Sequence, residues 1–282
     1  MPQAREPALN TPVSALSLAI LLLATMTVAG ATEPDSNPPE VQVPGIAVRA
    51  DRALQITPYL WAAELYGRIS PFRRGPTIGV DKPFSEVLDS LKFGGFIDVW
   101  ARSGRYVLSG DLAYVDTKEN KSFGPLPGIG PLPPGIHGAG RVDSKLFTAT
   151  LLGGYRVVDT PDWTLDALAG LRVWHVSNKV RVSALEQSRS YKESFGWAEP
   201  VLGVRAFTNL SDQLSMQAQA NIGGMGIGSR FAWSAQATMN YIINKNFSIS
   251  AGYKVLDVNY NRNEHVYDTR LHGPVLGLTY RF

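Results

Sequence analysis

The sequence predicts an all-β protein, a transmembrane antiparallel up-and-down β-barrel of about ten strands, within a range of eight to twelve. Three observations support this prediction. Apolar and polar residues alternate with a period of two, the alternating segments run long, and the links between them are short and long in turn. A strand needs about 9–11 residues to cross the hydrocarbon layer at a tilt, which is longer than most strands of soluble proteins.

The composition excludes several classes of protein. The chain has 282 residues, no cysteine, and 27 Lys and Arg against 24 Asp and Glu, which gives a formal net charge of +3 at pH 7. Without cysteine there is no disulfide, no thiolate metal site and no cysteine nucleophile. The basic residues are scattered along the sequence, so we expect no nucleic-acid partner.

The first segment, residues 1–31, has the order of a secretory signal peptide. Arg5 precedes the apolar stretch 13–29, and small residues suited to signal-peptidase cleavage follow it. The alternative is an N-terminal membrane anchor, which the short apolar span disfavours. Residues 32–52 are rich in proline and charge, and we expect an extended periplasmic lead-in there, followed by a barrel over residues 53–282.

Ten alternating segments follow the lead-in. In the eighth segment, for example, Phe231, Trp233 and Ala235 alternate with Ala232, Ser234 and Gln236. The segments span residues 53–65, 91–102, 105–117, 143–157, 162–178, 194–208, 212–224, 229–243, 246–260 and 269–282. An even number of such segments places both termini on one side of a membrane.

The links between the segments alternate in length. Short turns follow the second, fourth, sixth and eighth segments, whereas the other links are longer, at residues 66–90, 118–142, 179–193, 225–228 and 261–268. The link 225–228 is an exception, because it has only four residues. Short turns on one side and longer loops on the other are typical of bacterial outer-membrane barrels. We therefore expect a monomeric, multi-pass β-barrel protein of the cell outer membrane, surrounded by outer-membrane lipid and lipopolysaccharide, with periplasmic N- and C-termini.

Two of the longer links have unusual compositions. Residues 83–91 predict one or two turns of amphipathic helix, which would cap the mouth of the barrel or form a docking patch. Residues 123–140 contain almost only Gly, Pro and apolar residues, so we expect irregular structure there. This segment would either plug the barrel or protrude as an adhesive tip.

Aromatic residues lie near the ends of the segments, where their rings would sit at the depth of the lipid headgroups. They are Trp163, Phe195, Trp197, Phe207, Phe231, Trp233, Tyr241, Phe247 and Tyr280. The chain ends in an alternating segment with Tyr280 and Phe282 on one face. This ending resembles the signal that the barrel-assembly machinery recognises, so we expect that machinery to be a partner during biogenesis.

If the apolar face of each segment contacts lipid, the other face lines the lumen. The charged residues that this register predicts in the lumen are Asp98, Arg102, Asp111, Arg156, Asp166, Arg172, Glu199, Arg205 and Lys254. Two interpretations remain open. The residues form a structural network of ion pairs that fills a narrow barrel, or they form a constriction that selects small anionic or zwitterionic solutes. Ten strands leave little more room than their own side chains need, so a wide pore is not expected.

The search for catalytic motifs gives one weak candidate. His175 and Ser177 share one face of a predicted strand and are similar to the His-x-Ser-Asn motif of outer-membrane lipid A deacylases. Either Glu186 or Glu193 would have to orient the histidine, and the alternative is a polar pair at the membrane interface. The four histidines lack metal-ligand spacing, so we expect no metal and no cofactor. Glu264 and Asp268 lack the companion His-Asp pair of omptin proteases.

Five short segments occur in a characteristic order. They are Pro58-Tyr59-Leu60-Trp61, Trp197-Ala198-Glu199-Pro200 leading to Gly203-Val204-Arg205, Gly223 to Ser229, Gly252 to Asp257, and Gly273-Pro274 leading to Tyr280-Arg281-Phe282. Together they resemble a widespread family of uncharacterised Gram-negative outer-membrane β-barrel proteins. Two positions depart from the family pattern, since Glu199 stands where Asp is expected and Lys254 where Arg is expected. The resemblance implies a fold and a location but no activity.

We therefore expect a porin-like, non-enzymatic protein, a narrow or plugged channel or structural protein for small polar solutes. Two alternatives remain. One is an outer-leaflet lipid hydrolase that acts through His175 and Ser177. The other is a surface adhesin that acts through residues 66–90 and 118–142.

Overall fold

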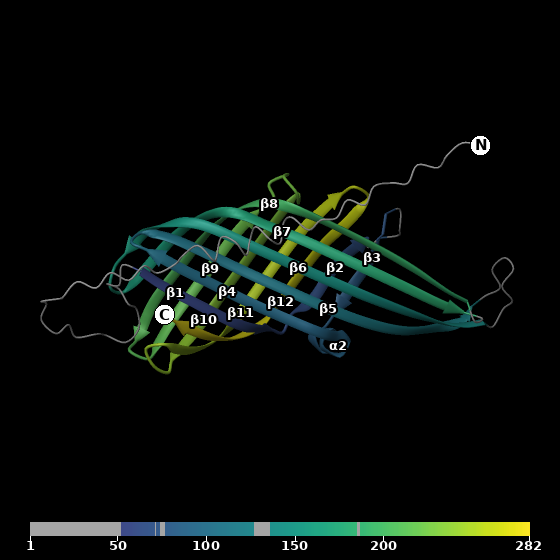
Figure 1. Ribbon diagram of the computed structural model, residues 1–282, viewed down its shortest axis with the longest axis horizontal. Coiled ribbons are helices and arrows are strands. Elements are labelled where there is room, and N and C mark those ends of the chain that lie inside the picture. Colours follow the sequence, from purple (N-terminus) through teal and green to yellow (C-terminus); the bar gives the residue numbers. More distant parts are fainter. Residues whose placement is uncertain (1–51, 71, 74–76, 127–135, 185–186) are drawn as a thin grey trace, which may run out of the picture. The chain divides into compact units, whose positions relative to one another are not determined.

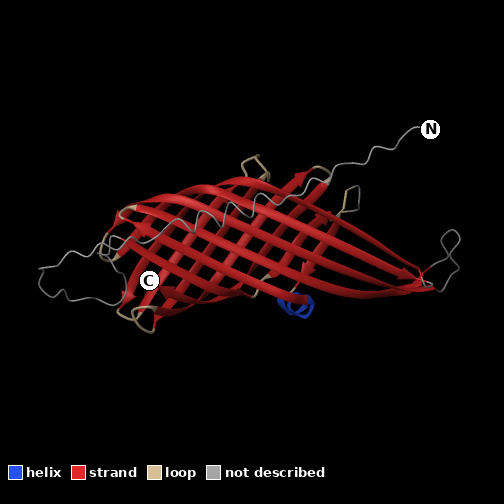
Figure 2. Cartoon of the chain, viewed as in Figure 1, coloured by secondary structure: helices blue, strands red, loops and turns tan. Residues whose placement is uncertain are grey.

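The computed structural model describes residues 52–70, 72–73, 77–126, 136–184 and 187–282. In this part of the chain, strands make up nearly all of the regular structure, and one short helix, α2 (Phe84–Ser90), lies beside them (Figures 1 and 2). The strands are β1 (Arg52–Trp61), β2 (Glu64–Ser70), β3 (Ile78–Lys82), β4 (Leu91–Ser103), β5 (Tyr106–Leu126), β6 (Ile136–Asp159), β7 (Trp163–Ala184), β8 (Gln187–Ser211), β9 (Leu214–Gly223), β10 (Phe231–Ile242), β11 (Phe247–Arg262) and β12 (His265–Arg281). No helix in the described ranges is both long and apolar enough to cross a membrane.

The sheet closes into a barrel. Its strands are hydrogen-bonded in the order β1-β4-β5-β6-β7-β8-β9-β10-β11-β12, and β12 pairs back onto β1. All of these pairings are antiparallel. The prediction of an antiparallel up-and-down barrel of about ten strands is therefore confirmed, with β2 and β3 as two additional strands.

The pairing of strands in the barrel wall changes close to the end of β1, where β1 and β4 cease to pair. Trp61 lies opposite Val275 of β12, and the Ala62 N–H donates to the Pro274 carbonyl at 3.0 Å. Strands β1 and β2 therefore both pair with β12, and the register does not change between them. On its other edge, β1 pairs with β4 only as far as Tyr59, and β2 then pairs with β3. Helix α2 follows β3 and contacts β2, β3 and β5. The link predicted at 66–90 thus contains two strands and the expected helix.

The other long links require a correction. Residues 118–142 and 179–193 were expected to be loops, but β5 continues to Leu126, β6 begins at Ile136, and β7 and β8 reach Ala184 and Gln187. Hairpin pairing continues for as long as two strands keep their register, and polar side chains on both faces are compatible with strands in water. The predicted segments end at the length needed to cross a bilayer, whereas these strands continue beyond it. Residues 127–135 lie outside the described ranges, and so does the choice between a plug and a protruding tip.

Two ends of the barrel can be distinguished by their connections. The tight turns after β4, β6, β8 and β10 lie at one end, called here the short-turn end, as the sequence predicts. The hairpins β5–β6, β7–β8 and β11–β12 turn at the opposite end, called here the long-hairpin end. Strands β5 to β8 extend furthest in this direction (Figure 1).

The outer surface of the barrel carries an apolar band between aromatic side chains. On β10, Phe231 and Tyr241 are 46% and 53% exposed and lie on the outward face with Ala237 and Met239 between them. Ten residues span about 33 Å along a strand, or about 25 Å across a bilayer at a tilt of about 40°. This matches the height of the apolar band of known membrane barrels. The large apolar side chains that other strands expose include Trp163, Leu151, Leu171, Leu202, Ile249 and Leu276.

Candidate functional site

The lumen contains the charged residues that the sequence predicts there. Seven of the nine are buried, and Asp98 and Asp111 line an interior cavity. They come from the inward faces of six strands, β4, β5, β6, β7, β8 and β11. The structure brings them together as several local groups of opposite charge rather than as one ring.

The group nearest the short-turn end is built on Arg156 and Asp166. Their side chains form an ion pair of 2.8 Å between Nε and Oδ1, and both are almost fully buried. The Trp100 indole N–H donates to the same carboxylate at 3.3 Å, and the guanidinium groups of Arg156 and Arg205 lie 5.4 and 5.5 Å from the Trp100 ring. Arg102 donates to the Gly104 carbonyl of the adjacent turn at 2.8 Å. The electron-rich face of an aromatic ring attracts cations, which reduces the cost of burying these guanidinium groups.

The second group lies deeper, around Lys254. Its ammonium group lies 3.0 Å from Asp111 Oδ2 and donates to the Tyr59 hydroxyl at 2.6 Å. The Tyr59 hydroxyl in turn donates to Asp111 at 2.7 Å, and the ammonium group lies 5.2 Å from the centre of the Trp61 ring. This arrangement connects β11, β5 and β1 across the lumen.

Glu199 is the centre of the third group. Its side chain is fully buried and accepts hydrogen bonds from the indoles of Trp174 and Trp197, at 3.0 and 3.2 Å, and from the Ser229 hydroxyl. The Arg172 guanidinium lies 3.7 Å away. A buried carboxylate is tolerated only when several donors replace its water shell, and here three side chains donate hydrogen bonds while Arg172 supplies the countercharge.

The tight β9–β10 turn is what brings Ser229 to this carboxylate. Gly224, Gly226 and Gly228 have φ of +81°, +84° and +75°, and Met225 also has a positive φ. A side chain on Gly228 would meet the Ala198 carbonyl oxygen at 2.2 Å. The glycine-rich segment of the sequence therefore forms a turn that packs closely against β8.

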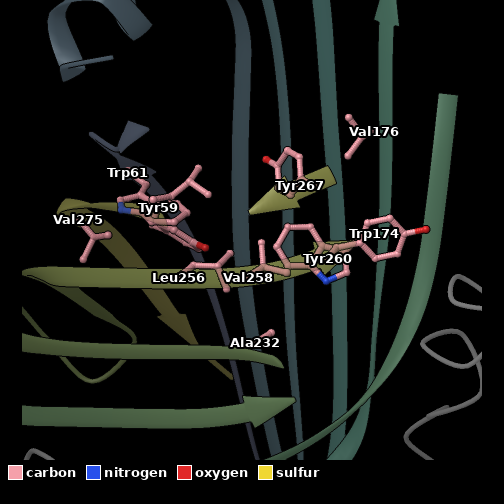
Figure 3. Packing of buried hydrophobic residues seen from close by; sticks show 11 residues of the cluster. Tyr59, Trp61, Trp174, Val176, Ala232, Leu256, Val258, Tyr260, Tyr267 and Val275 are labelled. Carbon is pink, nitrogen blue, oxygen red and sulfur yellow. The ribbon is translucent and has the colours of Figure 1, made fainter. Parts of the chain in front are cut away.

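A layer of aromatic side chains lies on the long-hairpin side of Glu199. This aromatic layer consists of Trp174, Phe195, Trp197, Tyr260 and Tyr267. Trp197 stacks on Tyr260 with ring centroids 4.0 Å apart and on Trp174 at 5.2 Å. Figure 3 shows Trp174 of β7 reaching into the same interior space as Tyr260 and Tyr267, which lie opposite each other on the neighbouring strands β11 and β12.

The aromatic layer was not predicted, and it corrects the expectation that two of its side chains lie at the membrane interface. Phe195 and Trp197 were expected at the membrane interface, but they stack inside the barrel, and Phe207 has the same strand parity as the buried Arg205. The alternation of side chains along the strand predicts the inward position of Phe195 and Trp197. They lie four and two residues before Glu199, so they share its face of β8, and the sequence already places Glu199 in the lumen.

Little free space remains at the middle of the lumen. The cavity there has a volume of about 30 Å³, which holds about two water molecules. Its lining is mainly polar and includes Arg172 and Asn221. One guanidinium nitrogen of Arg172, one of Arg205 and the Asn221 side-chain oxygen are buried without a hydrogen-bond partner among the described groups. The charged groups of the lumen are therefore only partly satisfied by one another.

His175 and Ser177 lie on the outward face of β7, which also carries Leu171 and Val173. The carboxylate proposed to orient His175 lies elsewhere. Glu193 faces the lumen, where it lies 3.3 Å from His265 Nε2, and Glu186 is outside the described ranges. Asp268, the residue considered for a protease, pairs with Arg68 at 2.7 Å. No group of three or more acidic or histidine side chains suited to a metal ion occurs in the described ranges.

Among known proteins, no family model matches the chain, and no curated protein matches it. Among solved structures, the chain is similar to the translocator domain of the autotransporter NalP from Neisseria meningitidis, with 15% identity, a TM-score of 0.48, and coverage of 83% of this chain and 90% of that one. It is also similar to the outer membrane protease OmpT from Escherichia coli, with 9% identity, a TM-score of 0.47, and coverage of 82% and 96%.

A third similar structure is the toluene transporter TodX from P. putida, with 9% identity, a TM-score of 0.33, and coverage of 82% of this chain and 89% of that one. These three proteins differ in what their names describe, and the identities and TM-scores are low. The likenesses therefore carry no conclusion about what this chain binds or does.

Proposed function

We propose that the chain is an integral outer-membrane protein, with its apolar band in the hydrocarbon layer and its short-turn end in the periplasm. The outward face of β7 supports the proposal, because it is apolar from Trp163 to Val173 and first becomes basic at Lys179. A lysine or arginine at the bilayer midplane costs about 2–4 kcal/mol, so this distribution favours the proposed depth. Known outer-membrane barrels have short periplasmic turns and longer extracellular loops.

We further propose that the barrel is a closed channel for small anionic or zwitterionic solutes. The single observation that carries this proposal is the pair of buried guanidinium groups, Arg172 and Arg205. Each has a nitrogen that lies 3.7 Å from a carboxylate, Glu199 or Asp98, but donates no hydrogen bond. A purely structural network would use these donors, because an unsatisfied buried donor is costly. In a channel the same donors coordinate water or a passing anion.

The aromatic layer is the barrier in this proposal. Below it, the lumen carries charged and amide side chains towards the short-turn end. At the layer itself, Trp174 stacks on Trp197 and Trp197 stacks on Tyr260. The channel is therefore shut in this conformation, and conduction requires the layer to separate.

Planar-bilayer recording of the refolded protein tests the proposal. We expect the parent to be silent, Trp197→Ala/Tyr260→Ala to give small currents that prefer anions, and Arg172→Gln added to that variant to reduce the preference. Trp163→Ala, which removes an outward tryptophan, is the matched control and is expected to remain silent. Folding of each variant is checked by its altered gel mobility before and after heating.

Two results would contradict the closed channel. Steady large currents from the parent would show that the aromatic layer does not shut the lumen. A folded Trp197→Ala/Tyr260→Ala variant that remains silent would show that the remaining charged groups fill the barrel, as in a structural protein.

The alternative functions have less support. A lipid hydrolase needs a carboxylate to orient His175, and Glu193 lies on the opposite face of the sheet from it. An adhesin would act through residues 66–90, which instead form β2, β3 and α2 on the barrel wall, and through 118–142, of which 127–135 are not described.

A further inference from the structure

The outward face of β5 to β8 carries an ordered grid of charged side chains above the apolar band. The strand register sets this grid. Its lowest row is aromatic, with Tyr114 beside Phe147 and Phe147 beside His175. The rows towards the long-hairpin end are Asp116–Lys145–Ser177–Ser194, then Lys118–Asp143–Lys179–Lys192, then Asn120–Arg141–Arg181–Ser190. Directly opposite residues on neighbouring strands have Cβ atoms about 5 Å apart.

The charge of this grid is strongly unequal. It contains six basic side chains and two acidic ones, and Lys92 of β4 adds a seventh basic group at its edge. Both acidic residues already have partners. Lys92 lies 2.8 Å from Asp143, and Lys145 lies 3.2 Å from Asp116. These hydrogen bonds raise the pKa of both lysines and lower the pKa of Asp143, so the paired groups remain charged.

Five basic groups of the grid therefore remain for another ligand. None of them has an ion pair within 4.0 Å to a carboxylate of the described residues. They are Lys118, Arg141, Lys179, Arg181 and Lys192. Arg141 donates to the neighbouring Asn120 side chain at 3.1 Å. Several unpaired cations arranged over neighbouring strands favour an anion with more than one charge.

An apolar recess lies directly beneath one side of this grid. It has a volume of about 460 Å³, within the usual range for ligand pockets, and Tyr114 and Phe147 of the aromatic row line it. Its lining also includes Pro58, Phe93, Gly95, Ile97 and Leu112, close to the place where β1 and β4 cease to pair. Cations above an apolar recess on the same outer wall match a molecule with an anionic head and an apolar tail.

We propose that this outer wall binds a phosphorylated lipid of the outer leaflet, with its phosphate on the row that contains Lys118 and Lys179 and an acyl chain in the recess beside Gly95. The proposal rests on the outer-membrane location proposed above. In an outer leaflet of lipopolysaccharide, the chemistry of lipid A, a diphosphorylated sugar with acyl chains, fits both parts of the site. The lumen takes no part in it.

Native mass spectrometry of the purified, detergent-solubilised protein with added lipid A tests the site. We expect the parent to retain one lipid A, and Lys118→Gln/Lys179→Gln to weaken its binding at least tenfold. The control Arg105→Gln/Lys245→Gln removes two basic groups at turns of the short-turn end and is expected to bind as the parent does. Gly95→Leu fills the recess from the outer side and is expected to weaken binding without changing any charge.

The outcomes separate the parts of the proposal. Equal binding by the parent and by Lys118→Gln/Lys179→Gln, or equal binding of dephosphorylated lipid A, would overturn phosphate recognition. Unchanged binding by Gly95→Leu would overturn the recess as the acyl site. Displacement of lipid A by millimolar inorganic phosphate would assign the cations to free anions instead. Conductance through the lumen does not depend on these side chains, so failure here is distinguishable from failure of the proposed channel.

Discussion

Trp197 on β8 lies flat against Tyr260 on β11, with ring centroids 4.0 Å apart, although β9 and β10 separate the two strands in the sheet. The contact is possible because β9 and β10 end early, at the tight turn that holds Ser229. Beyond this turn, β8 and β11 meet directly across the lumen. The short β9–β10 connection thus allows the aromatic contact that closes the lumen.

Glu199 is the residue on which this arrangement depends most. We expect Glu199→Gln to lower the free energy of unfolding by about 3–5 kcal/mol, because it leaves Arg172 buried without its countercharge and places an amide among donors. Urea titration in lipid vesicles measures this value. Glu64→Gln, at a half-exposed carboxylate, is the control and is expected to stay within about 0.5 kcal/mol of the parent. A loss no larger than that of the control would contradict the role of Glu199.

The turn before β10 gives a second prediction with a control in the same turn. Gly226→Ala places a side chain at positive φ in open space and is expected to cost about 1 kcal/mol. Gly228→Ala has the same backbone strain and also meets the Ala198 carbonyl, so we expect roughly twice that loss or more. Urea midpoints of the two variants provide the comparison. Equal losses would mean that the turn does not pack against β8.

The depth of the barrel in the bilayer gives a third prediction. Ala237 is outward at the middle of β10, and Ile243 is outward just beyond its end. We expect Ala237→Arg to lower the free energy of unfolding in vesicles by about 2–4 kcal/mol and Ile243→Arg by no more than about 1 kcal/mol. Equal costs at the two positions would show that residue 237 is not in the hydrocarbon layer.

The C-terminal residue gives a fourth prediction, which separates assembly from stability. Phe282 is 67% exposed, and its ring lies 4.6 Å from that of Tyr280. We expect Phe282→Ala to lower the fraction of assembled barrel in cells several-fold, yet to refold in detergent with less than about 1 kcal/mol of lost stability. Leu210→Ala, at an exposed apolar residue near the end of β8, is the control. Normal assembly of Phe282→Ala would contradict a role in recognition by the assembly machinery.

Much of the wall follows from period-two alternation, because a strand with one lipid face and one lumen face has only one favourable register. This is why the segment over 229–243 predicts β10 so closely and why the short turns lie where the sequence indicates. The division of the wall after Trp61 was not predictable, because β2 pairs with β3 through contacts that depend on the closed barrel. The extensions of β5 to β8 were missed because the prediction ended each segment at the length that crosses a bilayer, although Val180 continues the alternation with Lys179 and Arg181.

The sequence predicts which charged residues face the lumen but not which of them pair with one another. Parity alone places Arg172 and Lys254 on the inward face, whereas their neighbours depend on the stagger of distant strands. Lys254 pairs with Asp111, which is 143 positions away in the chain. The grid over Lys118 and Lys179 could not be recognised either, because it appears only once the register of four strands is known.

The central claim is that one face of the wall contacts lipid while the other is sealed from it, and tryptophan quenching tests this most directly. The chain has six tryptophans, so variants that keep only Trp163, only Trp233 or only Trp174 report on single positions. In vesicles of lipids brominated along their acyl chains, we expect strong quenching of Trp163 and Trp233, which face outward, and none of Trp174, which is 2% exposed inside the barrel. Quenching of Trp174 as strong as that of Trp163, or no quenching of Trp163, would contradict the account.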